Sequence, residues 1–253
     1  MRAYAFLGDA LLPYQSAVVD LVRERAVLEL APLAAGDLTE LDAIAGGGPA
    51  LLFLCGLPYV RTRDRGFPVR ALAAPVSSAA PESRPGYLSL LLGRPGLAGR
   101  HLDDLTDLRL GINGRDSMSG WVLPVGSGLP LERFSSITPT GAHRLSMDAL
   151  LRDEIDAAPI DSMLLAGELA STPAFATLPV LAEYGPSPSP PIVLVGGDDE
   201  LAERLTGVLE RLHQDDAGRA ALSLGRMARL ERMEDSDYDL TRACDRKAAE
   251  CTR

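Results

Sequence analysis

The sequence predicts an α/β protein with two lobes, and three observations support this prediction. Short apolar segments of the kind found in buried strands alternate with segments whose apolar residues recur at helical spacing. Two stretches that favour loops or extended chain, near residues 83–87 and 186–191, interrupt the alternation. With 253 residues, 46% hydrophobic and 24% charged, the chain is long enough for two cores of ordinary composition. We therefore expect residues 1–84 and 188–253 to form lobe one, and residues 85–187 to form lobe two.

Lobe one is expected to begin with a strand and an amphipathic helix. The helix shows Val18, Leu21 and Val22 at helical spacing. Short apolar runs bounded by turn residues indicate further strands, and acidic residues at 198–200 mark the start of a last helix. The expected strands are residues 4–7, 28–30, 50–55, 69–75 and 192–195, and the expected helices are residues 14–25 and 198–212. The charged end from Met233 is expected to fray.

Lobe two is expected to repeat the alternation of strands and helices. Its strands are expected at residues 87–92, 109–112 and 158–160, with helical segments at 102–105, 116–120 and 147–152. Pro124 lacks a backbone donor and clashes with the turn before it, so the helix that follows Gly120 is expected to be short or kinked. Alternating strands and helices of this kind favour parallel sheets.

Charge and composition disfavour several classes of partner. A formal net charge of -10 and a pI near 4.8 disfavour nucleic acid and anionic membranes, which require basic patches. No apolar run reaches the roughly 18 residues that span a bilayer, and the first residues do not form a secretory signal. We therefore expect a cytoplasmic protein without membrane insertion. A leader removed from the sequence would instead place the protein in the periplasm or outside the cell.

The cysteine pattern and the motif content indicate no cofactor. Cys55, Cys244 and Cys251 are too few and too widely spaced for a disulfide framework or a zinc knuckle. The motifs of zinc proteases, nucleophile-elbow hydrolases and phosphate-binding P-loops are missing from the sequence. We expect neither a cofactor nor a bound metal.

The strongest local signal runs from Asn113 to Gly120, directly after the strand at 109–112. A strand followed by a polar, glycine-containing turn and a helix start presents unpaired backbone N–H groups and a positive dipole end. Ser117, Met118, Ser119 and Gly120 form this start, which suits an anion. Capping of the helix by Asp116 or Ser117 explains the same residues without a ligand.

Two further segments place polar residues where a ligand can reach them. His143 follows Gly141 and Ala142, and its imidazole suits an oxyanion, although a lone histidine is more often a structural partner. Asp161 ends the strand at 158–160, the edge at which open α/β sheets hold ligands. Its carboxylate is equally suited to binding a ligand, orienting His143 or capping the next helix.

A fourth segment, Cys55-Gly56-Leu57-Pro58-Tyr59, follows the strand at 50–55. Gly56 permits close approach of the backbone, and the Tyr59 hydroxyl is a possible donor to a ligand. Cys55 would act as a nucleophile only beside a base that lowers its pKa, and the sequence shows none. We favour a small packed residue at this position.

Taken together and in this order, these four segments resemble the phosphate/phosphonate-binding family, the substrate-binding components of phosphate/phosphonate ABC transporters. The resemblance covers roughly residues 50–195, together with a plausible helix in the C-terminal tail. It implies the type II periplasmic-binding-protein fold, in which two crossing segments join two lobes. The ligand cleft lies between the lobes, and a hinge motion closes them around the ligand. It further implies an anion cradled by residues of both lobes: Cys55, Gly56 and Tyr59 from lobe one, and Ser117, Met118, Ser119, Gly120, His143 and Asp161 from lobe two.

The sequence departs from this family in two places. The family often carries Tyr-Asp-x-Pro-Glu after the first strand, where this chain reads Phe6 to Tyr14 without that pattern, and Pro124 interrupts the helix after Gly120. From the resemblance we nevertheless expect binding of a small anionic ligand such as phosphate or a phosphonate. An ABC transporter permease is the expected partner if a leader has been removed. The alternative is a cytoplasmic biosynthetic enzyme on the same fold, of lyase, dehydratase or cyclase type. In it His143 transfers a proton, Asp161 orients His143, and Cys55 is the less favoured catalytic residue.

Overall fold

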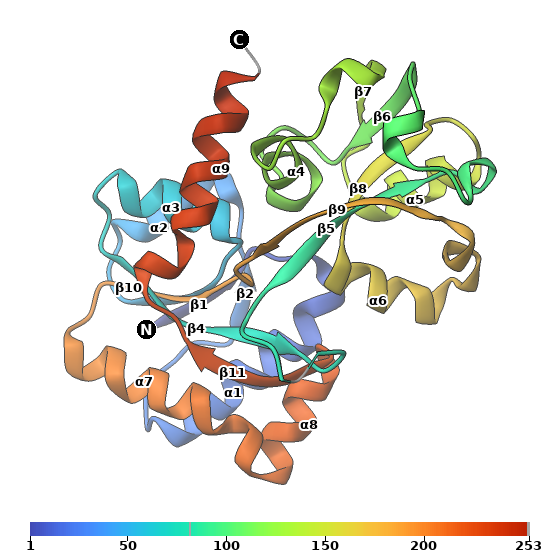
Figure 1. The fold of residues 1–253 in the computed structure, drawn as a ribbon. Coiled ribbons are helices and arrows are strands. Elements are labelled where there is room, and N and C mark those ends of the chain that lie inside the picture. Colours follow the sequence, from blue (N-terminus) through green and yellow to red (C-terminus); the bar gives the residue numbers. More distant parts are fainter. Residues whose placement is uncertain (81, 252–253) are drawn as a thin grey trace. The chain divides into compact units, whose positions relative to one another are not determined.

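The computed structural model describes residues 1–80 and 82–251, which form two compact units, each built around one β-sheet (Figure 1). The first unit contains Met1–Gly86 and Pro188–Asp239, and the second contains Tyr87–Ser187 and Leu240–Arg253. The chain therefore passes between the units at three places. The third lies inside a stretch that the sequence analysis assigned wholly to lobe one. The mixed α/β class predicted from the sequence is confirmed.

The described residues of the first unit form a six-stranded sheet in the order β11-β4-β10-β3-β1-β2. Its strands are β1 (Arg2–Ala5), β2 (Leu33–Ala35), β3 (Ala50–Phe53), β4 (Val69–Ser77), β10 (Ile192–Val195) and β11 (Met227–Arg232). Strands β1, β2 and β3 run parallel, whereas β10 is antiparallel to β3 and β4. The sheet is thus mixed rather than parallel. Strands β3 and β10 are buried along their whole length, which matches their unbroken apolar runs.

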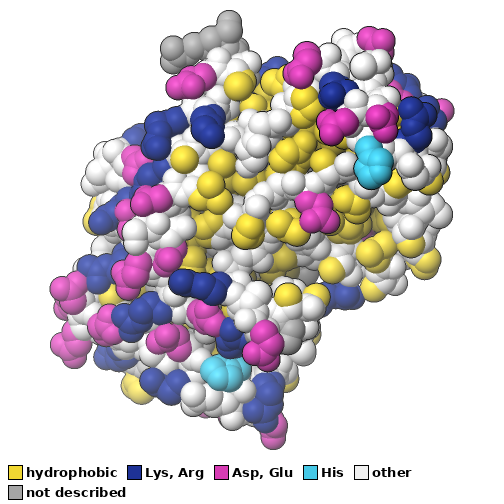
Figure 2. All heavy atoms as spheres, in the orientation of Figure 1, with side chains coloured by type: hydrophobic (Ala, Val, Ile, Leu, Met, Phe, Trp, Pro, Cys, Tyr) yellow, Lys and Arg dark blue, Asp and Glu magenta, His cyan; other side chains and the backbone are white. Residues whose placement is uncertain are grey.

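Five helices are described in the first unit. They are α1 (Leu12–Arg25), α2 (Leu41–Ala45), α3 (Gly56–Asp64), α7 (Asp199–Arg211) and α8 (Asp216–Leu224). The expected strand at 28–30 is wrong, since the strand lies at Leu33–Ala35. On the face shown in Figure 2, basic and acidic side chains are interspersed rather than gathered into a basic patch. Arg219 pairs with Asp216 within α8, and Arg232 of β11 pairs with Glu203 of α7.

The described residues of the second unit form a five-stranded sheet in the order β7-β6-β8-β5-β9. Its strands are β5 (Tyr87–Gly93), β6 (Leu108–Ile112), β7 (Phe134–Pro139), β8 (Ala157–Asp161) and β9 (Val180–Ser187), and its helices are α4 (Leu123–Gly126), α5 (His143–Leu151), α6 (Ser162–Ser171) and α9 (Asp239–Glu250). Strand β6 is parallel to β7 and β8, and β5 is antiparallel to β8 and β9.

One core cluster of the second unit fixes the direction of the side chains on β8. Ala158 and Ile160 pack into this cluster, together with Met147, Leu150 and Phe175. Because successive side chains of a strand point to opposite faces, Pro159 and Asp161 lie on the other face of the sheet. The core thus determines which way the acid at the end of β8 points.

The expected fraying of the C-terminal segment is wrong for its described part; Thr252 and Arg253 lie outside the described residues. Met233 is buried, and α9 buries Thr241, Cys244 and Ala248 on one face. Gly126 of α4 lies so close to α9 that a Cβ atom there would be 2.5 Å from the Cα of Cys244. The sequence of this segment is rich in charge because α9 is amphipathic: one face is buried and the charged residues lie on the rest of its surface. None of the described helices is long and apolar enough to cross a membrane.

Candidate ligand-binding site

The turn after β6 begins a short helix with unusual winding. Ser117 caps it, since its Oγ accepts a hydrogen bond from the Gly120 N–H at 3.0 Å. The segment Met118–Val122 is a π-helical turn that continues into α4. Pro124 cannot donate the α-helical bond to the Gly120 carbonyl, and the sequence expectation of a short, irregular helix is confirmed.

Two backbone donors at this helix start are left without acceptors. The N–H groups of Met118 and Ser119 make no hydrogen bond within the described part of the chain. The carbonyl of Ser119 is held from the other side by the hydroxyl of Ser89 on β5, at 2.6 Å. The Ser117 cap therefore satisfies one backbone donor of this helix start and leaves two open.

His143 joins this turn directly. It is the first residue of α5, which begins earlier than the sequence indicated, and its Nε2 lies 2.8 Å from the Oγ of Ser119. Burial lowers the pKa of His143 to about 4, although the carbonyl of Pro159 opposes part of this shift. The imidazole is therefore neutral at pH 7. It supports the Ser119 hydroxyl through a hydrogen bond and adds no positive charge.

Asp161 caps the following helix. Its Oδ1 accepts hydrogen bonds from the N–H groups of Met163 at 2.8 Å and Leu164 at 3.2 Å. Burial nevertheless raises the pKa of Asp161 to about 6, because desolvation outweighs the two N–H donors. Of the roles that the sequence left open, capping is the one that the structure places on Oδ1.

Register places Asp161 on the same side of the sheet as the Ser117–Gly120 turn. Ser89 of β5 is the antiparallel partner of Asp161 on β8, and directly opposed residues project to the same face. Since the Ser89 hydroxyl reaches the Ser119 carbonyl, this face is the one that the turn covers. Ser89 was missed from sequence because only its pairing with β8 brings it to the turn.

The arginines nearest to the turn in sequence have other partners. Arg144 pairs with Glu168 at 2.6 Å and with Asp148 at 3.3 Å, and its guanidinium lies 4.9 Å from the centre of the Phe175 ring. The exposed Arg115 lies over the ring of the buried Trp121, 4.6 Å from its centre. The donors at the helix start are therefore chiefly neutral.

The residues that the sequence proposed from lobe one lie in the first unit. Cys55 is half-buried and precedes α3, which begins at Gly56. The buried Tyr59 donates from its hydroxyl to Asp235 Oδ1 at 2.8 Å and accepts from the Ala71 N–H at 3.3 Å. Desolvation and the hydrogen bond to Asp235 raise the pKa of Tyr59. This hydroxyl is thus engaged within its own unit.

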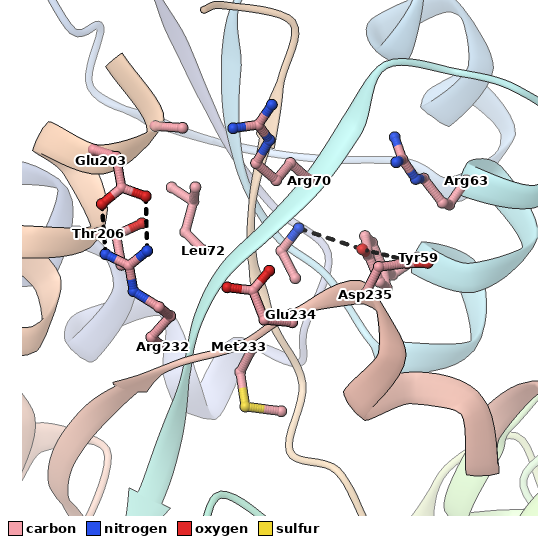
Figure 3. Close-up of a pocket in the computed structure, with 12 residues that line it drawn as sticks. Tyr59, Arg63, Arg70, Leu72, Glu203, Thr206, Arg232, Met233, Glu234 and Asp235 are labelled. Atoms are coloured by element: carbon pink, nitrogen blue, oxygen red, sulfur yellow. Dashed lines mark hydrogen bonds and ion pairs between the residues drawn. The ribbon is translucent and has the colours of Figure 1, made fainter. Parts of the chain in front are cut away.

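A hollow of about 180 Å³ lies beside Tyr59 (Figure 3). Arg63, Arg70 and Arg232 line it together with three acids, Glu203, Glu234 and Asp235. Arg232 makes two hydrogen bonds of 2.7 Å to Glu203, and Arg70 pairs with Asp199 at 2.7 Å. With its cations balanced by acids, this hollow does not favour an anion. Sequence reasoning missed this hollow, because α3, β4, α7, β11 and the segment after β11 build it jointly.

Comparison with protein families identifies the chain. Residues 35–238 match the family described as the periplasmic substrate-binding protein of phosphonate ABC transporters. This match covers well over half of the chain, and the protein therefore belongs to that family. Among curated proteins, none matches it in sequence. The resemblance stated from the four sequence segments is confirmed.

Solved structures show the same fold at low sequence identity. The binding-protein component of an ABC phosphonate transporter from Pseudomonas aeruginosa is 15% identical, with a TM-score of 0.79 over 100% of this chain and 87% of that one. PhnD1 from Prochlorococcus marinus, solved with methylphosphonate, is 14% identical, with a TM-score of 0.79 over 99% and 98%. The aliphatic sulphonate-binding protein SsuA from Escherichia coli is 12% identical, with a TM-score of 0.64 over 99% and 87%. These matches confirm the periplasmic-binding-protein fold.

Proposed function

We propose that this protein binds a small phosphorus oxyanion, phosphate or a phosphonate, at the helix start Ser117–Gly120. One observation supports this most strongly: the N–H groups of Met118 and Ser119 have no acceptor in the described chain, beside a hydroxyl that His143 fixes. Tetrahedral oxyanions suit such a cradle because each oxygen can accept from a different donor, and the helix dipole favours negative charge there.

Family membership supports the remaining parts of the proposal. The family description names a periplasmic protein that delivers substrate to an ABC transporter, so we propose a permease partner and a periplasmic location. That description lends no support to the cytoplasmic location or to the biosynthetic role considered from sequence. A pKa of about 4 also makes His143 a weak general base at neutral pH. Cys55, Gly56 and Tyr59 stay predicted contributors from the first unit.

Calorimetry on the purified protein tests the proposal. We expect methylphosphonate or phosphate to bind. Ser119→Ala should lower the affinity for that ligand by roughly 10- to 100-fold, because one hydroxyl donor and its hydrogen bond with His143 are lost. Ser135→Ala is the matched control, since the Ser135 hydroxyl donates only to carbonyls of residues 107 and 108 at the edge of the same sheet. Equal affinity of Ser119→Ala and wild type would remove this turn from the site.

A further inference from the structure

We propose that Ser89 of β5 is a positioning residue of the anion site: its hydroxyl takes the place of the backbone N–H that Pro124 lacks and thereby fixes the Ser117–Gly120 turn. The inference rests on the proposed function, because it concerns how the same turn is held. Three features of the second unit support it: the hydrogen-bond series of the turn, the burial of Ser89, and the connection from the Ser119 peptide to the open donors.

The hydrogen-bond series of the turn stops at Pro124. The Val122 N–H donates to the carbonyl of Ser117, five residues back, at 3.0 Å, and the Leu123 N–H continues this π-helical series. The third bond of the series would join the N–H of residue 124 to the Ser119 carbonyl. Because proline has no N–H, the winding of the turn leaves this carbonyl without its backbone donor.

Ser89 supplies a donor in its place. Its side chain is completely buried, and its hydroxyl donates to the Ser119 carbonyl at 2.6 Å. Strand β5 is paired with β8 on one side and with β9 on the other, so the hydroxyl comes from the interior of a sheet rather than from a loop (Figure 1). A buried carbonyl without a donor is costly, and the pairing of this one rests on a single side chain.

The Ser119 peptide connects this bond to the donors of the site. The Ser119 carbonyl and the Gly120 N–H belong to one planar peptide unit, and Ser117 Oγ accepts from that N–H at 3.0 Å. The unit is thus held at both ends, by Ser89 and by Ser117. Because this plane fixes the Cα of Ser119, it orients the hydroxyl that meets His143 and the open N–H of the same residue.

Loss of the Ser89 hydroxyl should therefore act on anion binding through the turn. An unpaired Ser119 carbonyl rotates toward another donor, and this rotation displaces the N–H groups and the hydroxyl that would hold an oxyanion. An N–H at position 124 removes the dependence, because it completes the interrupted series. The contribution of Ser89 should thus depend on Pro124.

The test is a double-mutant cycle, measured by calorimetric titration of the full chain with methylphosphonate and with phosphate. Ser89→Ala should lower the affinity by roughly tenfold or more. In a Pro124→Ala background the same substitution should lower it by less than about threefold, because residue 124 then offers an N–H to the Ser119 carbonyl.

The matched control is Ser187→Ala on the neighbouring strand β9. The Ser187 side chain is also buried, and its hydroxyl has no hydrogen-bond partner within the described residues. This variant should bind like wild type. Amide NMR spectra of the ligand-free protein give a second readout: Ser89→Ala should shift the signals of residues 118–121, and Ser187→Ala should not.

The outcomes separate this inference from the proposed function. Wild-type affinity of Ser89→Ala, or an equal loss in both backgrounds, would overturn the inference and leave anion binding at the turn intact. If Ser89→Ala does not fold, the double variant is decisive: its restored N–H should allow folding and binding, and its failure to fold would overturn the inference too. Failure of wild type to bind either ligand would overturn the proposed function and the role of Ser89 in it, whereas the amide signals would still show whether the Ser89 hydroxyl holds the turn.

Discussion

Replacing Gly126 by alanine should separate α4 from α9 and disturb the site that precedes α4. An added Cβ atom would lie 2.5 Å from the Cα, 2.6 Å from the Cβ and 2.8 Å from the carbonyl oxygen of Cys244. Carbon atoms in contact prefer about 3.5–4.0 Å, so the helices must separate by roughly 1 Å. Two of the three clashing atoms belong to the backbone of α9, and a change of side-chain rotamer cannot relieve them.

The expected magnitude follows from two opposing effects. Overpacking of this kind costs about 1–3 kcal/mol, and backbone clashes place Gly126→Ala at the upper end. Alanine gains up to about 1 kcal/mol over glycine as a helix former. The net loss of stability should therefore be about 1–2 kcal/mol. The same substitution at Gly167 in α6, where nothing lies within 4 Å, should instead stabilise by about 0.5–1 kcal/mol.

Urea unfolding followed by tryptophan fluorescence measures this difference within one unit. Trp121 is the single tryptophan of the chain, and it is buried in the helical turn just before α4. Its signal therefore reports on the second unit. We also expect weaker anion binding by Gly126→Ala, because α4 continues directly from the turn that carries Ser119. Stabilisation of Gly126→Ala to the same extent as Gly167→Ala would refute the packing argument.

Two further predictions concern buried polar groups. NMR titration should show that the His143 ring stays neutral down to about pH 4 in the folded protein. In the unfolded chain the same ring binds a proton near pH 6.5. The contribution of His143 to the free energy of unfolding should therefore fall as the pH falls from about 6.5 to 4. The stability difference between wild type and His143→Gln should change over that window by at most about 3 kcal/mol, and a flat difference would contradict the assignment. Tyr59→Phe should destabilise the first unit by roughly 1–3 kcal/mol, because the half-buried Asp235 and the buried Ala71 N–H lose their shared hydroxyl. The Trp121 unfolding transition should stay unchanged.

Sequence patterns alone predicted the type of fold and the positions of most strands in the two sheets. The apolar runs of β3 and β10 and the periodic apolar face of α7 are local signals, readable because burial on a strand or helix repeats with a fixed period. Pro124 likewise predicted an irregular helix, because its missing N–H acts within one turn. The packing of helix α9 was missed: its high charge conceals three buried residues, and their burial depends on packing at Gly126 and elsewhere in the second unit.

The candidate site was predicted in pieces from sequence, and only the tertiary structure brought Ser119 and His143 into contact. Polar residues at helix starts and strand ends are recognisable from the sequence, and Ser117, Ser119, His143 and Asp161 were predicted in this way. Their chemistry depends on partners far away in sequence: Ser119 meets His143 across 24 positions, and Tyr59 meets Asp235 across 176. Desolvation, which neutralises His143 and raises the pKa of Asp161, is likewise a property of the packed fold. Sequence thus determined which polar groups stand at the ends of the elements, and long-range packing decided their contacts and their charge.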